Sequence, residues 1–329
     1  MTTSVPAQAV PPGTGEDRYR IPPMMRHLRA PHIQDNLRTR DSIRQSLRRG
    51  LLADGFLEVD TPVAGPRLDE YRSGHIHTWD AFGQKLWLAQ SPQLYKQMLI
   101  AAGYRRYFQF AHCFRDEPLD QQRPDHLREF VQADIELEAT DAAQVRRLVE
   151  RLVAALCADL GLPCVTPFPQ LDAVECVARY GTDRPDLRTH PDELAFVWVN
   201  DFPLAEADHD GGPRFVRHPM ALPHHLPASP ADALGVRTHS YDLVLNGYEI
   251  ASGDLRIADA DLQCAVLDLV GVDTRALRPL LAVLRSGCPP HGGLGMGLDR
   301  LAMQFTRSAS VAEVTAFPAW SGYWDGGAR

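Results

Sequence analysis

An arginine, two acidic residues and an aromatic ring stand close together near the middle of the sequence. Arg115 lies in the segment FRDE (residues 114–117), and after a polar loop the segment HLREF (residues 126–130) ends in Phe130. A guanidinium in this setting can neutralise a phosphate group, while an aromatic ring can stack on a base. The two segments therefore indicate a nucleotide site, although an Arg-Asp-Glu triplet by itself is more typical of a surface salt-bridge cluster.

A second candidate lies near the C-terminus, where glycines run directly into an arginine. Residues 292–301 read GGLGMGLDRL, with Arg300 three positions after Gly297. Glycines let a backbone approach a ligand closely, and Arg300 at the start of a helix would face the same space. The pattern is neither a P-loop nor a dinucleotide fingerprint, so it specifies no ligand. A third segment, FLEVDTP (residues 56–62), follows a long helical pattern and resembles an edge strand.

Strands and helices that position these residues alternate irregularly along the chain. Hydrophobic periodicity predicts strands at residues 56–59, 85–88, 106–114, 129–138, 195–199, 240–245, 248–257 and 292–297. It predicts helices at residues 36–53, 93–102, 142–160, 258–269, 274–286 and 298–305. Neighbouring strands without regular helical crossovers favour the α+β class, with an antiparallel β-sheet flanked by helices.

Composition limits the kind of protein. The chain has 329 residues, 44% of them hydrophobic, which suffices for a large core. Its formal net charge is −8, whereas a protein that depends on phosphate contacts is usually basic. Extensive nucleic-acid binding is therefore not expected. The arginines that crowd residues 26–49 are interpreted as part of a solvated, partly dimer-facing helix.

The cysteines and the hydropathy of the sequence indicate the compartment in which the protein is expected. The six cysteines are scattered without zinc-binding spacing and are expected to be reduced thiols of a cytoplasmic protein. No stretch approaches the roughly 18 apolar residues of a membrane span, so no membrane partner is expected. Residues 1–22, rich in proline and glycine, are expected to be a disordered tail, and residues 23–329 a single folded domain.

Taken in order, the segments around residues 56–62, 114–130 and 292–301 resemble motifs 1, 2 and 3 of the class II aminoacyl-tRNA synthetases. The resemblance covers about residues 24–319. Further segments resemble the aspartyl enzymes in particular: residues 89–97, 130–136, 180–188, 198–204 and 246–249. The resemblance implies the class II synthetase fold for residues 23–329 and an adenylate-forming ligase that activates an amino acid with ATP. No general base is needed, because the amino-acid carboxylate is already a nucleophile.

The resemblance also assigns roles around ATP. Arg115 is expected to hold the α-phosphate, Phe130 to stack on adenine, and Arg300 to lie across the nucleotide. Asp242 and Glu249 are expected to bind Mg²⁺, which offsets charge on the pyrophosphate. Arg115, Glu249 and Arg300 are the expected catalytic residues. The complete expected ATP set is Arg115, Glu117, His126, Leu127, Phe130, Asp242, Glu249, Gly297 and Arg300.

For the amino acid, Lys96 and Arg256 match positions that grip the substrate's side-chain carboxylate in aspartyl enzymes. Asp134 matches the acid that orients the lysine. Two cations at one site reject a neutral amide, because the amide would leave buried charge unpaired. L-Aspartate is therefore the expected substrate. The remaining residues expected around it are Gln93, Gln132, His218 and Ser252.

Several features depart from the family. The sequence starts close to the catalytic core, without the β-barrel that reads the anticodon, and lacks the bacterial insertion domain after Arg188. The loop at residues 62–79 lacks the usual Glu-Gly motif, and Arg217 stands before His218 where bacterial members have paired histidines. With the acidic net charge, these departures predict an acyl acceptor other than a whole tRNA, such as ammonia or a small metabolite or nucleoside natural product.

Two alternatives are a minimal aspartyl-tRNA ligase and a non-catalytic paralogue that binds ATP or an amino acid as a regulator. The presence of Arg115, both metal carboxylates and Arg300 favours an enzyme over the regulator. Motif 1 forms the dimer interface in this family. A homodimer with a two-fold contact through about residues 36–62 is therefore expected.

Overall fold

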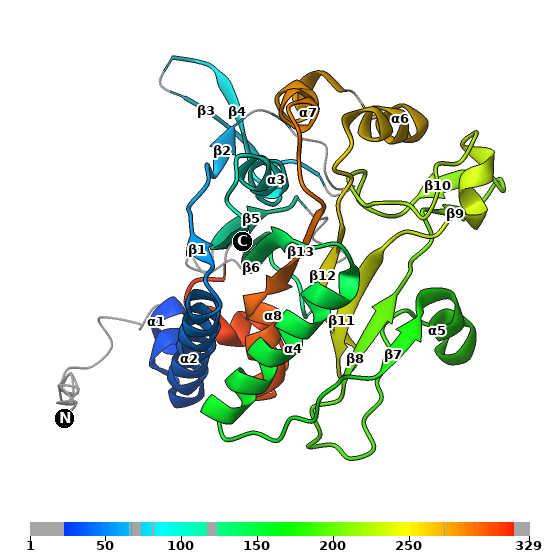
Figure 1. Ribbon diagram of the computed structural model, residues 1–329. Coiled ribbons are helices and arrows are strands. Elements are labelled where there is room, and N and C mark those ends of the chain that lie inside the picture. The colour runs from blue at the N-terminus through cyan, green and yellow to red at the C-terminus, as the bar shows by residue number, and fades with distance from the viewer. Residues whose placement is uncertain are drawn as a thin grey trace.

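An eight-stranded sheet forms the centre of the structure, with strand order β1-β5-β6-β13-β12-β11-β8-β7 (Figure 1). This computed structural model describes residues 23–65, 67, 74–80, 82–116, 124–272 and 274–318; the expected tail lies outside the described residues. The strands are β1 (Leu57–Glu58), β5 (Arg106–Phe114), β6 (Glu129–Glu138), β13 (His291–Gly297), β12 (Tyr248–Leu255), β11 (Ser240–Leu245), β8 (Phe196–Asn200) and β7 (Gln170–Asp172).

All neighbouring pairs from β5 to β8 are antiparallel, while β1 pairs parallel to β5, and β7 parallel to β8. The predicted α+β class with an antiparallel sheet is therefore confirmed for the central strands, and only the two edges of the sheet are parallel. The cause lies in the connections, because each edge strand is separated from its partner by a helix or a long loop.

Helices cover the sheet and supply much of the core. They are α1 (Pro23–Arg29), α2 (Pro31–Ala53), α3 (Gln93–Ala101), α4 (Ala142–Asp159), α5 (Ala173–Tyr180), α6 (Ala260–Val270), α7 (Arg278–Arg285) and α8 (Leu298–Thr306). Figure 1 shows α2 and α4 side by side against the sheet, in agreement with their mutual packing. Their buried stripes, such as Ile43, Leu47 and Leu51 of α2, enter the same core cluster as Val149 and Val153 of α4.

The start of α4 shows how local sequence sets a helix. The side chain of Asp141 accepts a hydrogen bond from the backbone nitrogen of Gln144, which satisfies one of the unpaired donors of the first turn. From Val145 onward, apolar residues recur every three or four positions, so one face of the helix is buried. The predicted helix at residues 142–160 is therefore confirmed almost to its last residue.

One predicted helix is broken. The sequence predicted a single helix over residues 274–286, but a 3₁₀ turn, η3 (Thr274–Leu277), precedes the separate α7. Pro279 has no N–H and fits only the first turn of an α-helix, so a new helix begins beside it. The predictions from the sequence also omitted β7 and α5, which are both short elements.

Glycines in the central strands permit unusually close strand packing. A Cβ on Gly293 would lie 2.0 Å from the carbonyl oxygen of Ile135, and one on Gly253 would lie 2.2 Å from the oxygen of Gly293. Neither contact is possible for a larger residue. Part of the glycine-rich motif predicted to approach a ligand is thus required by the sheet itself.

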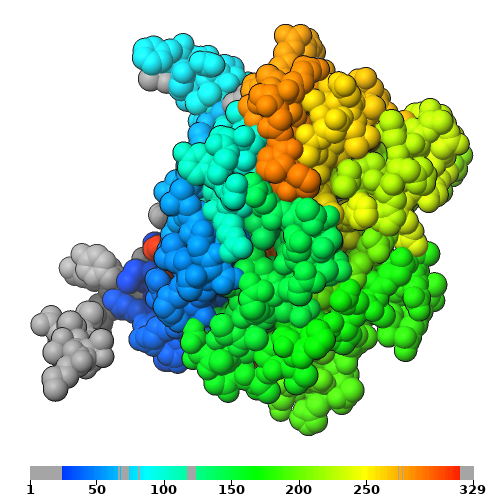
Figure 2. All heavy atoms as spheres, in the orientation of Figure 1, coloured from blue at the N-terminus to red at the C-terminus, as the bar shows by residue number. Residues whose placement is uncertain are grey.

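Two small sheets flank the main one. The first, in the order β2-β4-β3, comprises β2 (Ala64–Gly65), β4 (Lys85–Leu88) and β3 (His77–Trp79). In Figure 2 its cyan atoms project from the upper left of the molecule. The second pairs β9 (Ala205–Ala207) with β10 (Pro213–Phe215).

Cysteines, membrane character and assembly can be compared with the sequence predictions. All six cysteines are free thiols, as expected. Among the helices of the described residues, none combines the length and apolar run that a bilayer crossing requires. The homodimer stays a prediction; Leu52 near the end of α2 and Leu57 of the edge strand β1 are 51% and 49% exposed.

Candidate active site

A cavity of about 280 Å³ lies over the centre of the sheet. It brings together residues from α3, β6, β12, β13 and α8, elements that are far apart in the sequence. Of the predicted site residues, Glu117 lies outside the described residues and Asp242 does not line the cavity. The predicted residues that do line it are Gln93, Lys96, Arg115, His126, Leu127, Phe130, Gln132, Asp134, His218, Glu249, Ser252, Arg256, Gly297 and Arg300.

The β5–β6 hairpin carries the predicted phosphate and base contacts. Just after β5, the backbone nitrogen of Arg115 donates to the oxygen of Arg128 at 2.9 Å, which fixes the backbone of this arginine. The guanidinium carbon of Arg115 lies 5.0 Å from the centre of the Phe130 ring. A cation for phosphate and an aromatic face for a base are therefore at the same end of the cavity.

Arg300, in the first turn of α8, is held by two other elements. Its Nε donates to the backbone oxygen of Asp125 at 3.0 Å, and its Nη1 to the backbone oxygen of Glu249 at 2.9 Å. Its Nη2 lies 3.0 Å from His126 Nε2. The guanidinium is thus positioned before any ligand binds, which is the arrangement that electrostatic stabilisation of a charged group needs.

Asp125 is a strongly ionised carboxylate beside Arg300. Burial by itself would raise its pKa, but the hydrogen bond with His126 and the charge of Arg300 lower the pKa of Asp125 to about 2. The carboxylate therefore stays charged at neutral pH and keeps His126, at 2.9 Å, and Arg300 oriented.

Asp242, a predicted Mg²⁺ ligand, is paired with a cation of the protein. Arg217 donates to its two carboxylate oxygens, with Nη2 at 3.1 Å from Oδ1 and Nη1 at 3.4 Å from Oδ2. The guanidinium also lies 4.2 Å from the Phe202 ring centre and contacts Ser252 Oγ at 3.4 Å. A metal ion at Asp242 would therefore compete with a fixed positive charge.

The opposite end of the cavity holds a buried network of five charges. Lys96 Nζ lies 3.0 Å from Asp134 Oδ1 and 3.3 Å from Glu136 Oε2. Arg256 donates through Nε and Nη2 to the two oxygens of Glu136, at 2.9 and 3.1 Å. Its Nη1 donates to Asp254 Oδ1 at 2.5 Å. None of the five side chains is more than 6% exposed.

These neighbours shift the pKa values of the network in opposite directions. Burial opposes ionisation of Glu136, yet the charges of Arg256 and Lys96 lower its pKa to about 2. For Asp134 and Asp254, burial outweighs the nearby cations and raises the pKa. Burial also lowers the pKa of His218 well below its usual range, so this residue is a neutral imidazole. Its Nδ1 accepts from the backbone nitrogen of Met220 at 3.2 Å.

Comparison with known proteins places this geometry in a family. A sequence model described as "tRNA synthetases class II (D, K and N)" matches residues 17–321. This chain belongs to the class II tRNA synthetases of the D, K and N group. It is therefore a ligase, and the class II fold predicted from the sequence is confirmed.

Individual relatives agree with this membership. An aspartate–tRNA(Asp/Asn) ligase of Chlamydia pneumoniae is 28% identical, in a match that covers 88% of this chain and 72% of the relative. The asparaginyl-tRNA synthetase of Pyrococcus horikoshii was solved with asparaginyl-adenylate. Its structure matches this one with a TM-score of 0.71 at 20% identity, and the match covers 90% of this chain and 70% of the Pyrococcus chain. The Entamoeba histolytica enzyme, solved with the same adenylate, gives 0.70 at 20% identity, covering 89% and 68%.

Three acidic residues of the site were missed by the sequence reading. Asp125 and Asp254 line the cavity of this class II chain, and so does Asp299. Asp254 carried a usable signal, because it stands two residues before Arg256, and alternate residues of a strand share a face. Asp299 was not predicted, because the family resemblance assigned a role only to its neighbour Arg300.

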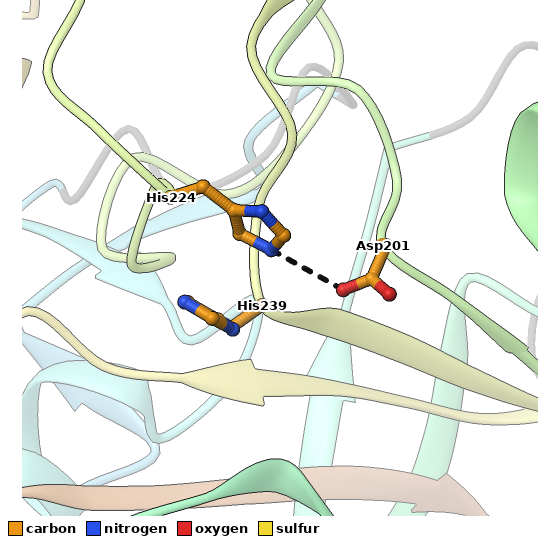
Figure 3. Close-up of side chains that lie close together, drawn as sticks. All are labelled: Asp201, His224 and His239. Atoms are coloured by element: carbon orange, nitrogen blue, oxygen red, sulfur yellow. Dashed lines mark ion pairs between the residues drawn. The ribbon is translucent and has the colours of Figure 1, made fainter.

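A separate group of metal-capable side chains consists of Asp201, His224 and His239 (Figure 3), whose candidate ligand atoms lie within 4.8 Å of one another. His224 Nε2 lies 3.3 Å from Asp201 Oδ1. The centres of the two imidazole rings are 4.2 Å apart at an interplanar angle of 35°, which is a tilted arrangement. The group therefore combines one His–Asp contact with a tilted pair of imidazole rings.

Asp299 connects the cavity to the helical layer, and this connection can be tested. Its carboxylate accepts from the backbone nitrogen of Val131 at 2.9 Å and pairs with Arg40 of α2 at 2.8 Å. We expect Asp299→Asn to lower the free energy of unfolding by about 2 kcal/mol, because a buried charge-assisted bond is lost. Urea denaturation measures this change.

The matched control is Asp35→Asn, which removes the exposed ion pair with Arg38 on the same helix α2. Such a surface pair contributes at most about 1 kcal/mol. Equal effects of the two substitutions would contradict the structural role given to Asp299.

Proposed function

We propose that this ligase activates an amino acid of the aspartate or asparagine type with ATP, forming an aminoacyl-adenylate and pyrophosphate. The supporting observation is that one cavity joins two sets of groups. Arg115, Phe130 and Arg300 suit a nucleotide, while Lys96 and Arg256 suit a polar amino-acid side chain. The relatives solved with asparaginyl-adenylate share this fold.

The chemistry needs positioning more than proton transfer. The amino-acid carboxylate oxygen attacks the α-phosphorus of ATP, a new O–P bond forms, and the bond from the α-phosphorus to the oxygen bridging to the β-phosphate breaks. Charge increases on the leaving pyrophosphate. Arg115 offsets charge at the α-phosphate, and Arg300, fixed by its bonds to Asp125 and Glu249, receives the nucleotide without reorganisation.

Class II synthetases use ATP with a divalent metal ion, and the residues here fit Mg²⁺ in part. Glu249 lines the cavity with 35% of its side chain exposed, and carboxylate oxygen is the ligand type that Mg²⁺ prefers. Asp242 fits only when Arg217 releases it. Bound Mg²⁺ would supply charge compensation for the phosphates.

Which amino acid is activated is a separate question. The sequence prediction of aspartate rests on the resemblance to the aspartyl enzymes at Lys96, Arg256 and Asp134. It stays a prediction, and the exchange of pyrophosphate into ATP, driven by each of the twenty amino acids in turn, tests it without any acceptor.

For the acceptor, we propose ammonia or the amine or hydroxyl of a small molecule. The support is the formal net charge of −8, which is unfavourable for a large phosphate-binding surface. The second candidate is tRNA, favoured by the aspartate–tRNA(Asp/Asn) ligase that this chain resembles. We expect the chain, given ATP and its amino acid, to form an amide with ammonia and not to charge tRNA. Charging of tRNA at physiological salt, with no amide product, would reject this proposal.

Arg115 provides a direct test of adenylate formation. We expect Arg115→Ala to slow amino-acid-dependent pyrophosphate exchange roughly 100-fold or more, because one cation facing the reacting phosphate is lost. The control is Arg105→Ala, which removes an exposed arginine just before the same strand, 3.5 Å from Glu138. Thermal unfolding should be unchanged in both variants. Full exchange by Arg115→Ala would remove this residue from the mechanism.

Arg217 should set the metal requirement. We expect Arg217→Ala to lower the Mg²⁺ concentration for half-maximal exchange by roughly threefold or more, because a positive charge bound to Asp242 is removed. Titration of Mg²⁺ at saturating ATP measures this. Arg214→Ala, which breaks an exposed pair with Glu206, should leave the requirement unchanged. A higher requirement in Arg217→Ala would show that the guanidinium supports metal binding instead.

A further inference from the structure

The amino-acid end of the cavity contains more carboxylates than cations. Lys96 and Arg256 carry two positive charges, and Asp134, Glu136 and Asp254 carry three negative ones, all buried and in direct contact. With every group ionised, the subsite has a net charge of −1 from these five residues. If burial keeps one of the carboxyls protonated, the balance is zero. In neither state does the network hold an excess positive charge for another anion.

Neighbouring charges do not alter this balance. Arg217 is the next cation toward the nucleotide end, and it is bound to both oxygens of Asp242. His218 is buried and neutral, for the reason given above. Among the described residues, the charge balance of the side-chain subsite is therefore set by the five residues of the network.

Asp254 is the residue that makes the number of carboxylates in the subsite exceed the number of cations. Lys96 and Arg256 would be matched one to one by Asp134 and Glu136, and Arg256 already forms a two-bond fork with Glu136. Asp254 adds a third carboxylate on Arg256 Nη1, at 2.5 Å. It also lines the cavity. The guanidinium nitrogen outside the Glu136 fork is thus engaged by the protein's own carboxylate.

We propose that Asp254 is a specificity-determining residue that makes this subsite select an uncharged amide side chain over a carboxylate. The inference rests on the proposed amino-acid activation. A substrate carboxylate would add a fourth anion to a buried site, where like charges in contact are costly. An amide instead donates its N–H groups to a carboxylate and accepts from Lys96 or Arg256, so it satisfies both signs of charge.

The position of Asp254 in the sheet fixes its backbone. Asp254 pairs with Gly293 on β13 and with Ser240 on β11, so both sides of its backbone are held by neighbouring strands. Gly253 and Gly293 bring β12 and β13 too close for larger residues. The backbone of Asp254 is therefore fixed beside Arg256, and the hydrogen bond from Arg256 Nη1 holds the carboxylate in place.

The test compares asparagine with aspartate in pyrophosphate exchange, using the full chain without an acceptor. We expect the wild-type kcat/KM for asparagine to exceed that for aspartate by roughly tenfold or more. Asp254→Asn keeps the shape and the acceptor for Arg256 but removes the charge. This change should shift the ratio toward aspartate by roughly tenfold. Asp254→Ser, which releases Arg256 Nη1, should shift it further.

Controls separate specificity from folding and from activity itself. Asp210→Asn, in an exposed turn, should leave the ratio unchanged. If Asp254→Ser does not fold, the Asp254→Asn ratio and calorimetric binding of both amino acids to the wild type decide. Exchange that prefers aspartate in the wild type, or an equal ratio in Asp254→Asn, overturns the role of Asp254 while adenylate formation stands. Exchange with none of the amino acids overturns both proposals.

Discussion

The buried ion network around Arg256 is the interaction on which the amino-acid half of the site depends. It joins α3 through Lys96, β6 through Asp134 and Glu136, and β12 through Asp254. A buried ion is tolerated only when its partners and hydrogen bonds are complete, since desolvation of an unpaired charge costs several kcal/mol. These ion pairs therefore hold α3, β6 and β12 in a fixed arrangement. That arrangement sets the shape and the charge of the subsite.

The sheet and helices then hold this network against the nucleotide end. Glycines at 253 and 293 allow β12 and β13 to approach closely, and Asp299 ties α8 to β6 and to α2. Because α8 also carries Arg300, the same helix holds one proposed nucleotide contact and stabilises the strand that carries Phe130. The proposed catalytic surface is thus part of the packed core, which suits a reaction that depends on preorganised charge.

Charges in this cavity are arranged as pairs rather than as isolated ligands. Arg217 pairs with Asp242, and Arg300 lies between Asp125 and Glu249. A metal ion at Asp242 must therefore displace Arg217, and the free energy of its binding is the difference between the two sets of bonds. For this reason, the ion-pair partner of a charged residue in the cavity says more about ligand selectivity than the type of that residue does.

Sequence alone determined the secondary structure of the long elements and the order of the three motifs, because these follow from local periodicity and from residue types at fixed spacing. Most of the residues that line the cavity were named through the family resemblance, whereas Asp125, Asp254 and Asp299 were missed. The break before α7 was also within reach, because Pro279 is a local signal. Tertiary structure alone decided which charge meets which: Arg40 with Asp299 across 259 positions, and Arg217 with Asp242 across 25. Ion pairing depends on distances of a few ångströms between separate strands and helices, and only the packed sheet sets those distances.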